Sequence, residues 1–169
     1  QTCALPILSP PSMADSQPKP NGVLMFDICE IMENVPHRYP FLLIDRVIEF
    51  EPNQSVTVLK NISINEAQFQ GHFPEKPVFP GVYIIENMAQ ASCFLLSKSS
   101  GGLQKNAVYF LGKVSKVSFM QPVTPGDQLI TTVNIEKLMG ESSMVTARST
   151  VNGKLVAKGE LMFGMRKEK

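Results

Sequence analysis

Cysteine and histidine are scarce in this chain: its 169 residues include three cysteines, two histidines and no tryptophan. Cys3, Cys29 and Cys93 are far apart, which fits neither a disulfide framework nor a CxxC metal motif. Two histidines add few further metal ligands. The sequence therefore predicts a protein of a reducing compartment that holds no metal.

An excess of charge of one sign is also missing, because 16 basic and 15 acidic residues leave a formal net charge of +1. No long basic run and no zinc-finger or helix-turn-helix spacing occurs, so no nucleic acid is expected as a partner. The longest apolar stretch is interrupted by Glu86, Asn87 and Gln90, and the N-terminus lacks a basic segment followed by a sustained apolar run. We expect a soluble, cytoplasmic protein with no membrane span.

Proline is concentrated at the start of the chain, where residues 1–22 carry five prolines and no hydrophobic periodicity. Such a composition buries little apolar surface. It predicts a tail over residues 1–22 that is flexible or left over from expression, with Met13 as an alternative start. The remainder, residues 23–169, is expected to form a single domain, since a hydrophobic content of 43% is enough for one core.

Local patterns predict two helices and a set of strands. A short helix begins at Asp27 and stops before Pro36, and a long apolar helix covers residues 81–97. Strands are expected over residues 41–50 and 55–62, and alternation of period two predicts others around 129–135 and 145–151, with an Asn-Gly turn at 152–153.

These elements predict an α+β fold. One long central helix covered by roughly five or six strands favours a curved antiparallel sheet wrapped around that helix. A single sheet leaves an edge strand unpaired, so dimerisation through that edge is expected.

Two ionisable side chains stand out near the long helix. Glu86 is the only charged residue between Gly81 and Lys98, and His72 lies in the Gly-His-Phe-Pro segment that precedes the helix. Loss of hydration favours the neutral form of a carboxyl group, and an imidazole exchanges protons near neutral pH. The two are therefore a candidate acid and base. Gln90, four residues after Glu86, is on the same helix face and can hold its carboxyl group.

The start of the long helix predicts a second part of the site. Proline before the helix presets φ for its first turn, and glycine allows a ligand to approach the backbone. The free N–H groups of Gly81 and Val82, backed by the positive end of the helix dipole, form a candidate oxyanion hole for a polarised carbonyl.

Structural interpretations compete with these roles. A lone histidine near a Gly-Pro loop, such as His72, is more often a turn-capping or partly exposed residue than a catalyst. For Glu86 the two interpretations weigh about equally, because a structural buried carboxylate needs an Arg or Lys nearby. We favour a structural role for His37 and core packing for Cys93. Nine methionines and ten phenylalanines fit an ordinary core or a pocket for a flexible acyl chain.

Four motifs occur in a specific order between about Phe26 and Met165. They are residues 36–46 (Pro-His-Arg-Tyr-Pro-Phe-Leu-Leu-Ile-Asp-Arg), 71–74 (Gly-His-Phe-Pro) continued by 77–82 (Pro-Val-Phe-Pro-Gly-Val), 86–91 (Glu-Asn-Met-Ala-Gln-Ala) and 122–127 (Pro-Val-Thr-Pro-Gly-Asp). With them the chain closely resembles the bacterial (3R)-hydroxyacyl-acyl carrier protein dehydratases of the FabZ type.

The resemblance implies a hot-dog fold, a homodimer whose sheets join across the subunits, and usually a trimer of dimers. It also implies dehydration of a 3-hydroxyacyl thioester on acyl carrier protein to the trans-2-enoyl thioester in type II fatty acid biosynthesis, without metal or nucleotide cofactor. The active site of the family combines a histidine of one protomer with a glutamate of the other. His72 and Glu86 occupy those positions.

The resemblance further implies residue roles. His72 removes a proton from C2 while the Gly81 amide polarises the thioester oxygen, and Glu86 assists loss of the C3 hydroxyl. Val78 is expected to position substrate through its backbone, and Tyr109 matches an aromatic residue that gates the acyl tunnel in some relatives. The sister enzyme that also isomerises the double bond has aspartate at the position of Glu86, which favours dehydration alone.

Acyl carrier protein is acidic, so a basic rim is expected at the mouth of the tunnel. Candidates for this rim are Lys98, Lys113, Lys116, Arg166 and Lys167.

Two other functions are compatible with this architecture. A hot-dog thioesterase releases a free thiol from an acyl thioester, whereas a dehydratase forms an enoyl product that absorbs ultraviolet light. A non-catalytic acyl-binding protein has neither activity, and its histidine and glutamate are idle.

Overall fold

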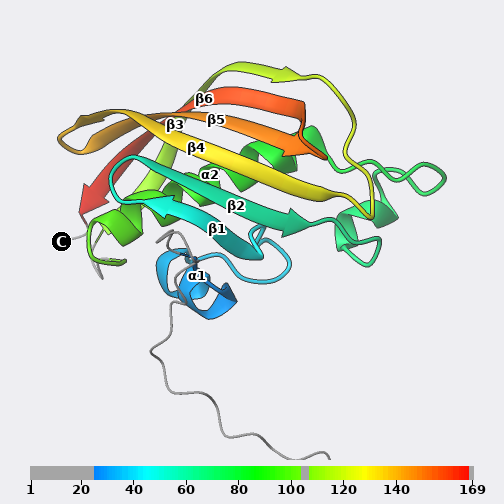
Figure 1. Ribbon diagram of the computed structural model, residues 1–169, viewed down its shortest axis with the longest axis horizontal. Helices are drawn as coiled ribbons and strands as arrows, with labels where there is room; N and C mark the ends of the chain where they lie inside the picture. The colour runs from blue at the N-terminus through cyan, green and yellow to red at the C-terminus, as the bar shows by residue number, and fades with distance from the viewer. Residues whose placement is uncertain (1–24, 104–106, 168–169) are drawn as a thin grey trace, which may run out of the picture.

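The computed structural model describes residues 25–103 and 107–167, so the predicted tail over residues 1–22 lies outside the described residues. Its elements in chain order are α1 (Ile28–Asn34), β1 (Arg46–Glu51), β2 (Ser55–Asn61), the 3₁₀ helix η1 (Ala67–Gln70), α2 (Gly81–Ser99), β3 (Ala107–Phe119), β4 (Gln128–Met139), β5 (Ser142–Val151) and β6 (Lys154–Lys167). The strands form one six-stranded antiparallel sheet in the order β1-β2-β4-β5-β6-β3. Figure 1 shows this sheet curving over α2, which confirms the predicted architecture.

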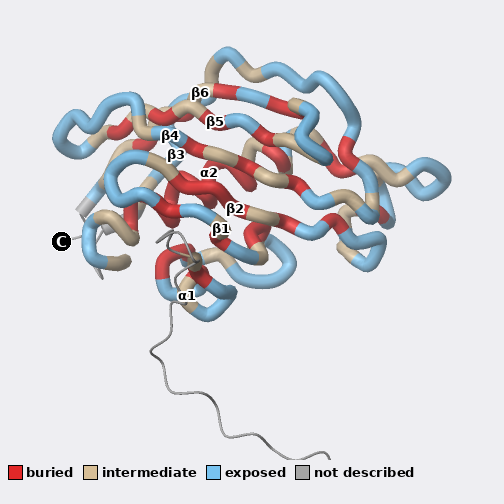
Figure 2. Tube along the Cα trace, in the orientation of Figure 1, coloured by how far each residue is buried: buried red, intermediate tan, exposed pale blue. Residues whose placement is uncertain are grey.

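The core lies between α2 and the concave face of the sheet. Ala91, Phe94 and Leu95 of α2 are fully buried, and Figure 2 shows buried residues along this helix and at alternating positions of the strands. In β4 and β5 the predicted inward faces are confirmed, since they bury Leu129, Thr131 and Val133, and Val145, Ala147 and Ser149. The period of two in these segments reflects contact with one buried helix.

The short helix α1 is confirmed and its start has a local cause. Asp27 Oδ1 accepts hydrogen bonds from the backbone N–H groups of Cys29 and Glu30, at 2.9 and 3.1 Å. These bonds satisfy two of the free donors at the helix N-terminus. The helix ends at Asn34, two residues before Pro36, as the proline predicts.

The predicted strand over residues 41–50 is wrong in its first half, because β1 begins only at Arg46. Side chains of α2 take up the backbone groups that a neighbouring strand would otherwise pair. Gln90 accepts from Leu43 N–H at 2.8 Å and donates to Phe41 oxygen at 2.7 Å, and Asn87 donates to Leu43 oxygen at 2.7 Å. Leu43 and Ile44 of this segment are thus buried without belonging to the sheet.

Asn87 also joins the helix to the sheet. Its side-chain oxygen accepts a hydrogen bond of 2.6 Å from Thr131 of β4, whose hydroxyl lies 2.7 Å from that of Ser149 in β5. All three side chains are buried, so this network satisfies polar groups that would otherwise cost stability. It fixes the position of α2 beneath β4 and β5.

The two edges of the sheet differ. At the β1 edge an isolated bridge pairs Phe26 with Val47. At the other edge, β6 is the one described strand that pairs with β3, and β3 exposes apolar side chains, among them Phe110, Leu111, Val114 and Phe119. A long apolar edge strand is a ready site for pairing with another chain.

None of the described helices combines the length and apolar character that crossing a bilayer requires.

Candidate active site

His72 lies in the turn after η1 and is half-buried. Its Nδ1 is 2.8 Å from the carbonyl oxygen of Val78, and the N–H of Val78 donates to the carbonyl of His72 over 3.1 Å. Because a carbonyl can only accept, Nδ1 carries the hydrogen and Nε2 keeps its lone pair. The ring also stacks on Phe73, with 4.0 Å between the centroids. An imidazole held in this way can accept a proton at Nε2.

Segment 122–127 supports the loop that holds His72. The carbonyl of Val78 binds the imidazole, and the next residue, Phe79, donates its N–H to the carbonyl of Val123 at 2.8 Å. The segment is itself a closed turn, in which Asp127 accepts from the backbone N–H and the hydroxyl of Thr124 at 2.8 and 3.1 Å. The second and fourth sequence motifs therefore lie against each other.

Gly81 is the first residue of α2, and Pro80 precedes it as the N-cap. The first helical N–H groups that reach Pro80 oxygen are those of Tyr83 and Ile84, at 2.9 and 3.3 Å. Within the described ranges, the N–H groups of Gly81 and Val82 have no acceptor, as expected for a helix N-terminus. A Cβ atom at Gly81 would lie 3.0 Å from two ring atoms of Phe119. Glycine therefore allows the ring of Phe119 to lie close to the start of α2.

Glu86 projects from the second turn of α2, and its side chain is 22% exposed. The predicted bond to Gln90 is present: Gln90 Nε2 donates to Glu86 Oε1 at 3.0 Å. Gln90 is itself buried and is held by the backbone of Phe41 and Leu43. The carboxyl group thus has a fixed support on one side and remains partly open on the other.

His37 lies beside Glu86, a contact that the sequence analysis did not predict. Its Nε2 lies 3.4 Å from Glu86 Oε1, and its ring lies 5.8 Å from that of Phe41. The contact arises because residues 36–43 cross the face of α2 that carries Glu86 and Gln90. The sequence contained one indication of this contact. The apolar run over residues 41–44 follows His37 closely, and such a run has to pack against a buried element such as the long helix.

His72 and Glu86 belong to different parts of the chain. No hydrogen bond or ion pair connects them in residues 25–103, which contain both side chains. One protomer therefore presents the candidate base and acid in separate settings.

Tyr109, the predicted tunnel residue, belongs to β3. It lies opposite Met165 of β6, half-buried and packed against the core.

Of the predicted basic rim, two lysines are paired within the chain. Lys98 lies 3.2 Å from Glu30 and over the ring of Phe26, and Lys116 lies 2.8 Å from Glu160. The side chain of Lys167 lies outside the described residues, whereas Lys113 and Arg166 are exposed. The last two are the more available for a charged partner.

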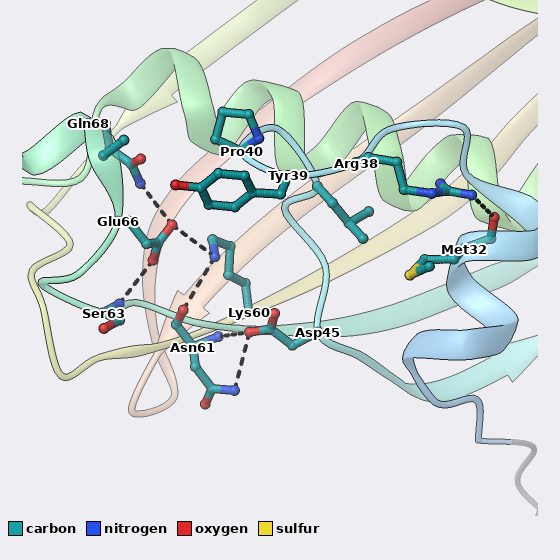
Figure 3. Close-up of a pocket in the computed structure, with 12 residues that line it drawn as sticks. Met32, Arg38, Tyr39, Pro40, Asp45, Lys60, Asn61, Ser63, Glu66 and Gln68 are labelled. Carbon is teal, nitrogen blue, oxygen red and sulfur yellow. Dashed lines mark hydrogen bonds and ion pairs between the residues drawn. The ribbon is translucent and has the colours of Figure 1, made fainter. Parts of the chain in front are cut away.

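A pocket of about 740 Å³ lies beside residues 38–45 but contains neither His72 nor Glu86. Figure 3 shows that its polar side chains bind one another. Buried Lys60 lies 3.0 Å from Glu66, which also accepts from Ser63 N–H at 2.9 Å and from Gln68 at 2.8 Å. These contacts tie β2 to η1 and so help to place the turn that carries His72.

Comparison with known proteins identifies the family. The model of the FabA-like domain matches residues 35–160, which include all four sequence motifs. A curated relative from Erwinia tasmaniensis, 3-hydroxyacyl-(acyl-carrier-protein) dehydratase FabZ, is 46% identical over 139 residues, or 82% of this chain and 92% of the relative. The chain belongs to the FabZ-type dehydratase family. Proteins of the same name from Vibrio atlanticus and Escherichia coli O9:H4 are 46% and 44% identical, over 83% and 82% of this chain and 93% and 92% of their own length.

Solved structures confirm the hot-dog fold of this FabZ-type chain. The dehydratase heterocomplex ApeI:P from Xenorhabdus doucetiae superposes with a TM-score of 0.70 at 19% identity, over 81% of this chain and 91% of that chain. A hot-dog-like protein from Thermanaerovibrio acidaminovorans gives 0.57 at 17% identity, over 70% and 84%. Family membership makes this protein a dehydratase, that is, a hydro-lyase of fatty acid biosynthesis.

Proposed function

We propose that this protein dehydrates a (3R)-3-hydroxyacyl thioester carried on acyl carrier protein to the trans-2-enoyl thioester, with His72 as base and Glu86 as acid. The observation that carries the proposal is the hydrogen bond between His72 Nδ1 and the Val78 carbonyl, because it leaves Nε2 free to take a proton. The support of Glu86 by Gln90 on one side only is the matching feature of the acid.

The reaction needs one proton removed and one delivered. His72 Nε2 takes a proton from C2, and the electron pair moves toward the thioester carbonyl, whose oxygen the free N–H groups at Gly81 and Val82 stabilise. The C3–O bond then breaks as Glu86 gives its proton to the departing hydroxyl, so that water leaves. Transfer of the C2 proton from His72 to Glu86 through solvent restores the starting state.

The proposed site is shared by two protomers. Because no hydrogen bond or ion pair joins His72 and Glu86 within one chain, His72 would act with Glu86 of the partner subunit. The exposed apolar edge of β3 is the surface that supports such pairing. Phe119, at the end of β3, lies against Gly81, so a partner paired along this edge would lie near the candidate oxyanion hole. The proposed assembly is a homodimer, and three dimers form the larger particle. Lys113 and Arg166 are the proposed contacts for acidic acyl carrier protein.

The proposal includes a cytoplasmic location. Within the described ranges, the exposed Cys29 and the buried Cys93 are both free thiols, which is the usual state in a reducing compartment.

Turnover of 3-hydroxybutyryl-acyl carrier protein tests the proposal, with formation of the enoyl product followed by ultraviolet absorbance. We expect the wild type to be active and His72→Ala and Glu86→Gln to lose most activity. Glu33→Gln, at an exposed position of α1, should be unaffected. An active Glu86→Gln or His72→Ala variant would contradict the assigned roles. Thiol release without enoyl formation would indicate a thioesterase instead, and neither product would indicate an acyl-binding protein.

The shared site has its own test. A mixture of the inactive His72→Ala and Glu86→Gln proteins, allowed to exchange subunits, should regain part of the activity because some interfaces then contain one intact site. Sedimentation measures the assembly in parallel, and an active monomer would contradict the shared site.

A further inference from the structure

Two nitrogen atoms converge on one oxygen of Glu86. Gln90 Nε2 lies 3.0 Å and His37 Nε2 lies 3.4 Å from Oε1. The other carboxyl oxygen, Oε2, has no hydrogen-bond partner in the parts of the chain that the structure describes. The two oxygens of this carboxyl group are therefore in different chemical settings.

The backbone decides which way Gln90 points. Leu43 N–H can only donate, so at 2.8 Å it requires the side-chain oxygen of Gln90. The Phe41 carbonyl can only accept, so at 2.7 Å it requires Nε2. Nε2 therefore also faces Glu86, and Oε1 must be the acceptor. When Glu86 is a neutral acid, its proton is consequently on Oε2, the oxygen left for substrate.

The same reasoning sets the tautomer of His37. An unprotonated Nε2 would place its lone pair close to the lone pairs of Glu86 Oε1, and the two would repel each other. A protonated Nε2 is instead attracted to that oxygen. The other ring nitrogen, Nδ1, is buried and has no partner among the described residues. A hydrogen on Nδ1 would be a buried donor without an acceptor, which folded proteins avoid. His37 is thus a neutral imidazole with its hydrogen on Nε2, the nitrogen that lies 3.4 Å from Glu86 Oε1.

We infer that His37 is a positioning residue for Glu86, whose Nε2–H stabilises the carboxylate that forms when Glu86 gives its Oε2 proton to the departing hydroxyl. This inference rests on the proposed function of Glu86. In that step the Oε2–H bond breaks, a new O–H bond forms in the water that leaves, and the negative charge on the carboxylate faces two N–H donors. His37 itself neither gains nor loses a proton.

The distance explains why the effect is expected on the chemical step. The present 3.4 Å is longer than the roughly 2.7–2.9 Å of a charge-assisted N–H···O bond. The contact is therefore long in this structure, and it strengthens as negative charge develops on Glu86. An interaction that grows in the transition state raises kcat more than it changes KM.

Substitutions at His37 test this role. His37→Leu keeps an apolar side chain without a donor, and His37→Gln places an amide N–H close to the position of Nε2. We expect kcat to fall about 10- to 100-fold in the leucine variant, with KM nearly unchanged and with most of kcat restored in the glutamine variant. Tyr39→Phe is the matched control, because Tyr39 belongs to the same segment and is 88% exposed. If His37 had a purely structural role, kcat of the leucine and glutamine variants would not differ in this way.

A second readout does not depend on activity. The infrared C=O band of protonated Glu86 is identified by its absence in Glu86→Gln. It should move to higher frequency in His37→Leu, because Oε1 loses a donor, and return toward the wild-type value in His37→Gln. If the leucine variant does not fold, His37→Asn replaces it, since the shorter amide cannot reach Oε1.

The outcomes separate this inference from the proposed function. A wild type that forms no enoyl product refutes the proposed function. The shift of the C=O band in His37→Leu then shows, without any activity, whether His37 donates to Glu86. An active wild type with an inactive Glu86→Gln and a fully active His37→Leu overturns the inference alone. An unchanged C=O band in the leucine variant also overturns it.

Discussion

Gln90 connects the candidate acid to the segment that crosses α2, so its replacement should affect stability and activity together. Its buried side chain bonds to Leu43 N–H, to the Phe41 carbonyl and to Glu86, at 2.8, 2.7 and 3.0 Å. Gln90→Leu retains a side chain of similar size and removes all three bonds. The perturbation therefore isolates polar contacts from packing.

The magnitude follows from which groups remain buried. Leu43 is buried, so its N–H loses its partner without access to water, at a cost of about 1–3 kcal/mol. Phe41 is 40% exposed, so its carbonyl can rehydrate at lower cost. Leucine recovers part of the loss, by about 0.8 kcal/mol for each additional buried CH₂ group. We expect a net loss of about 1–3 kcal/mol in the free energy of unfolding, or about 2–12 °C in Tm.

Denaturant unfolding followed by circular dichroism measures the free energy, and the dehydratase assay measures kcat. Gln54→Leu is the matched control, because Gln54 is exposed in the β1–β2 turn and should change the free energy of unfolding by less than about 0.5 kcal/mol. We expect kcat of Gln90→Leu to fall about tenfold or more, since Glu86 loses its support. A Gln90→Leu protein as stable and as active as Gln54→Leu would refute the assigned role of these bonds.

Two further predictions concern other residues of α2. Burial raises the pKa of the Cys93 thiol to about 11, so Cys93 should resist alkylation at pH 8 while exposed Cys29 reacts. Site-resolved mass spectrometry is the measurement. Equal labelling of the two thiols in the folded protein would contradict this. Gly81→Ala should lower the free energy of unfolding by about 1–3 kcal/mol through collision with Phe119, and Phe119→Ala should relieve that loss in the double variant. An equal cost of Gly81→Ala in both backgrounds would disprove the collision.

Several features were predictable from the sequence because their causes are local. The start of α2 at Gly81 follows from the proline-glycine pair before an apolar run, and the helix continues to Ser99, two residues beyond the predicted end. The inward faces of β4 and β5 follow from alternation, because every second side chain of a strand faces the same side. The choice of His72 and Glu86 as candidate groups likewise needed only residue types and their immediate neighbours.

Other features depended on contacts between distant segments. Residues 41–44 are apolar enough for a strand, yet Gln90, 47 positions after Leu43, bonds to the backbone of Phe41 and Leu43 instead. No local pattern contains that partner. The same crossing brings His37 to Glu86, where sequence reasoning favoured a merely structural role.

By itself the sequence determined the family, the central helix, the strand faces and the identity of the candidate acid and base. Tertiary structure alone decided the tautomer of His72, which oxygen of Glu86 contacts Gln90 and His37, and the place of β3 at the edge of the described sheet. The physical reason is that periodicity and capping act within one element, whereas a hydrogen bond between elements depends on how their buried faces pack.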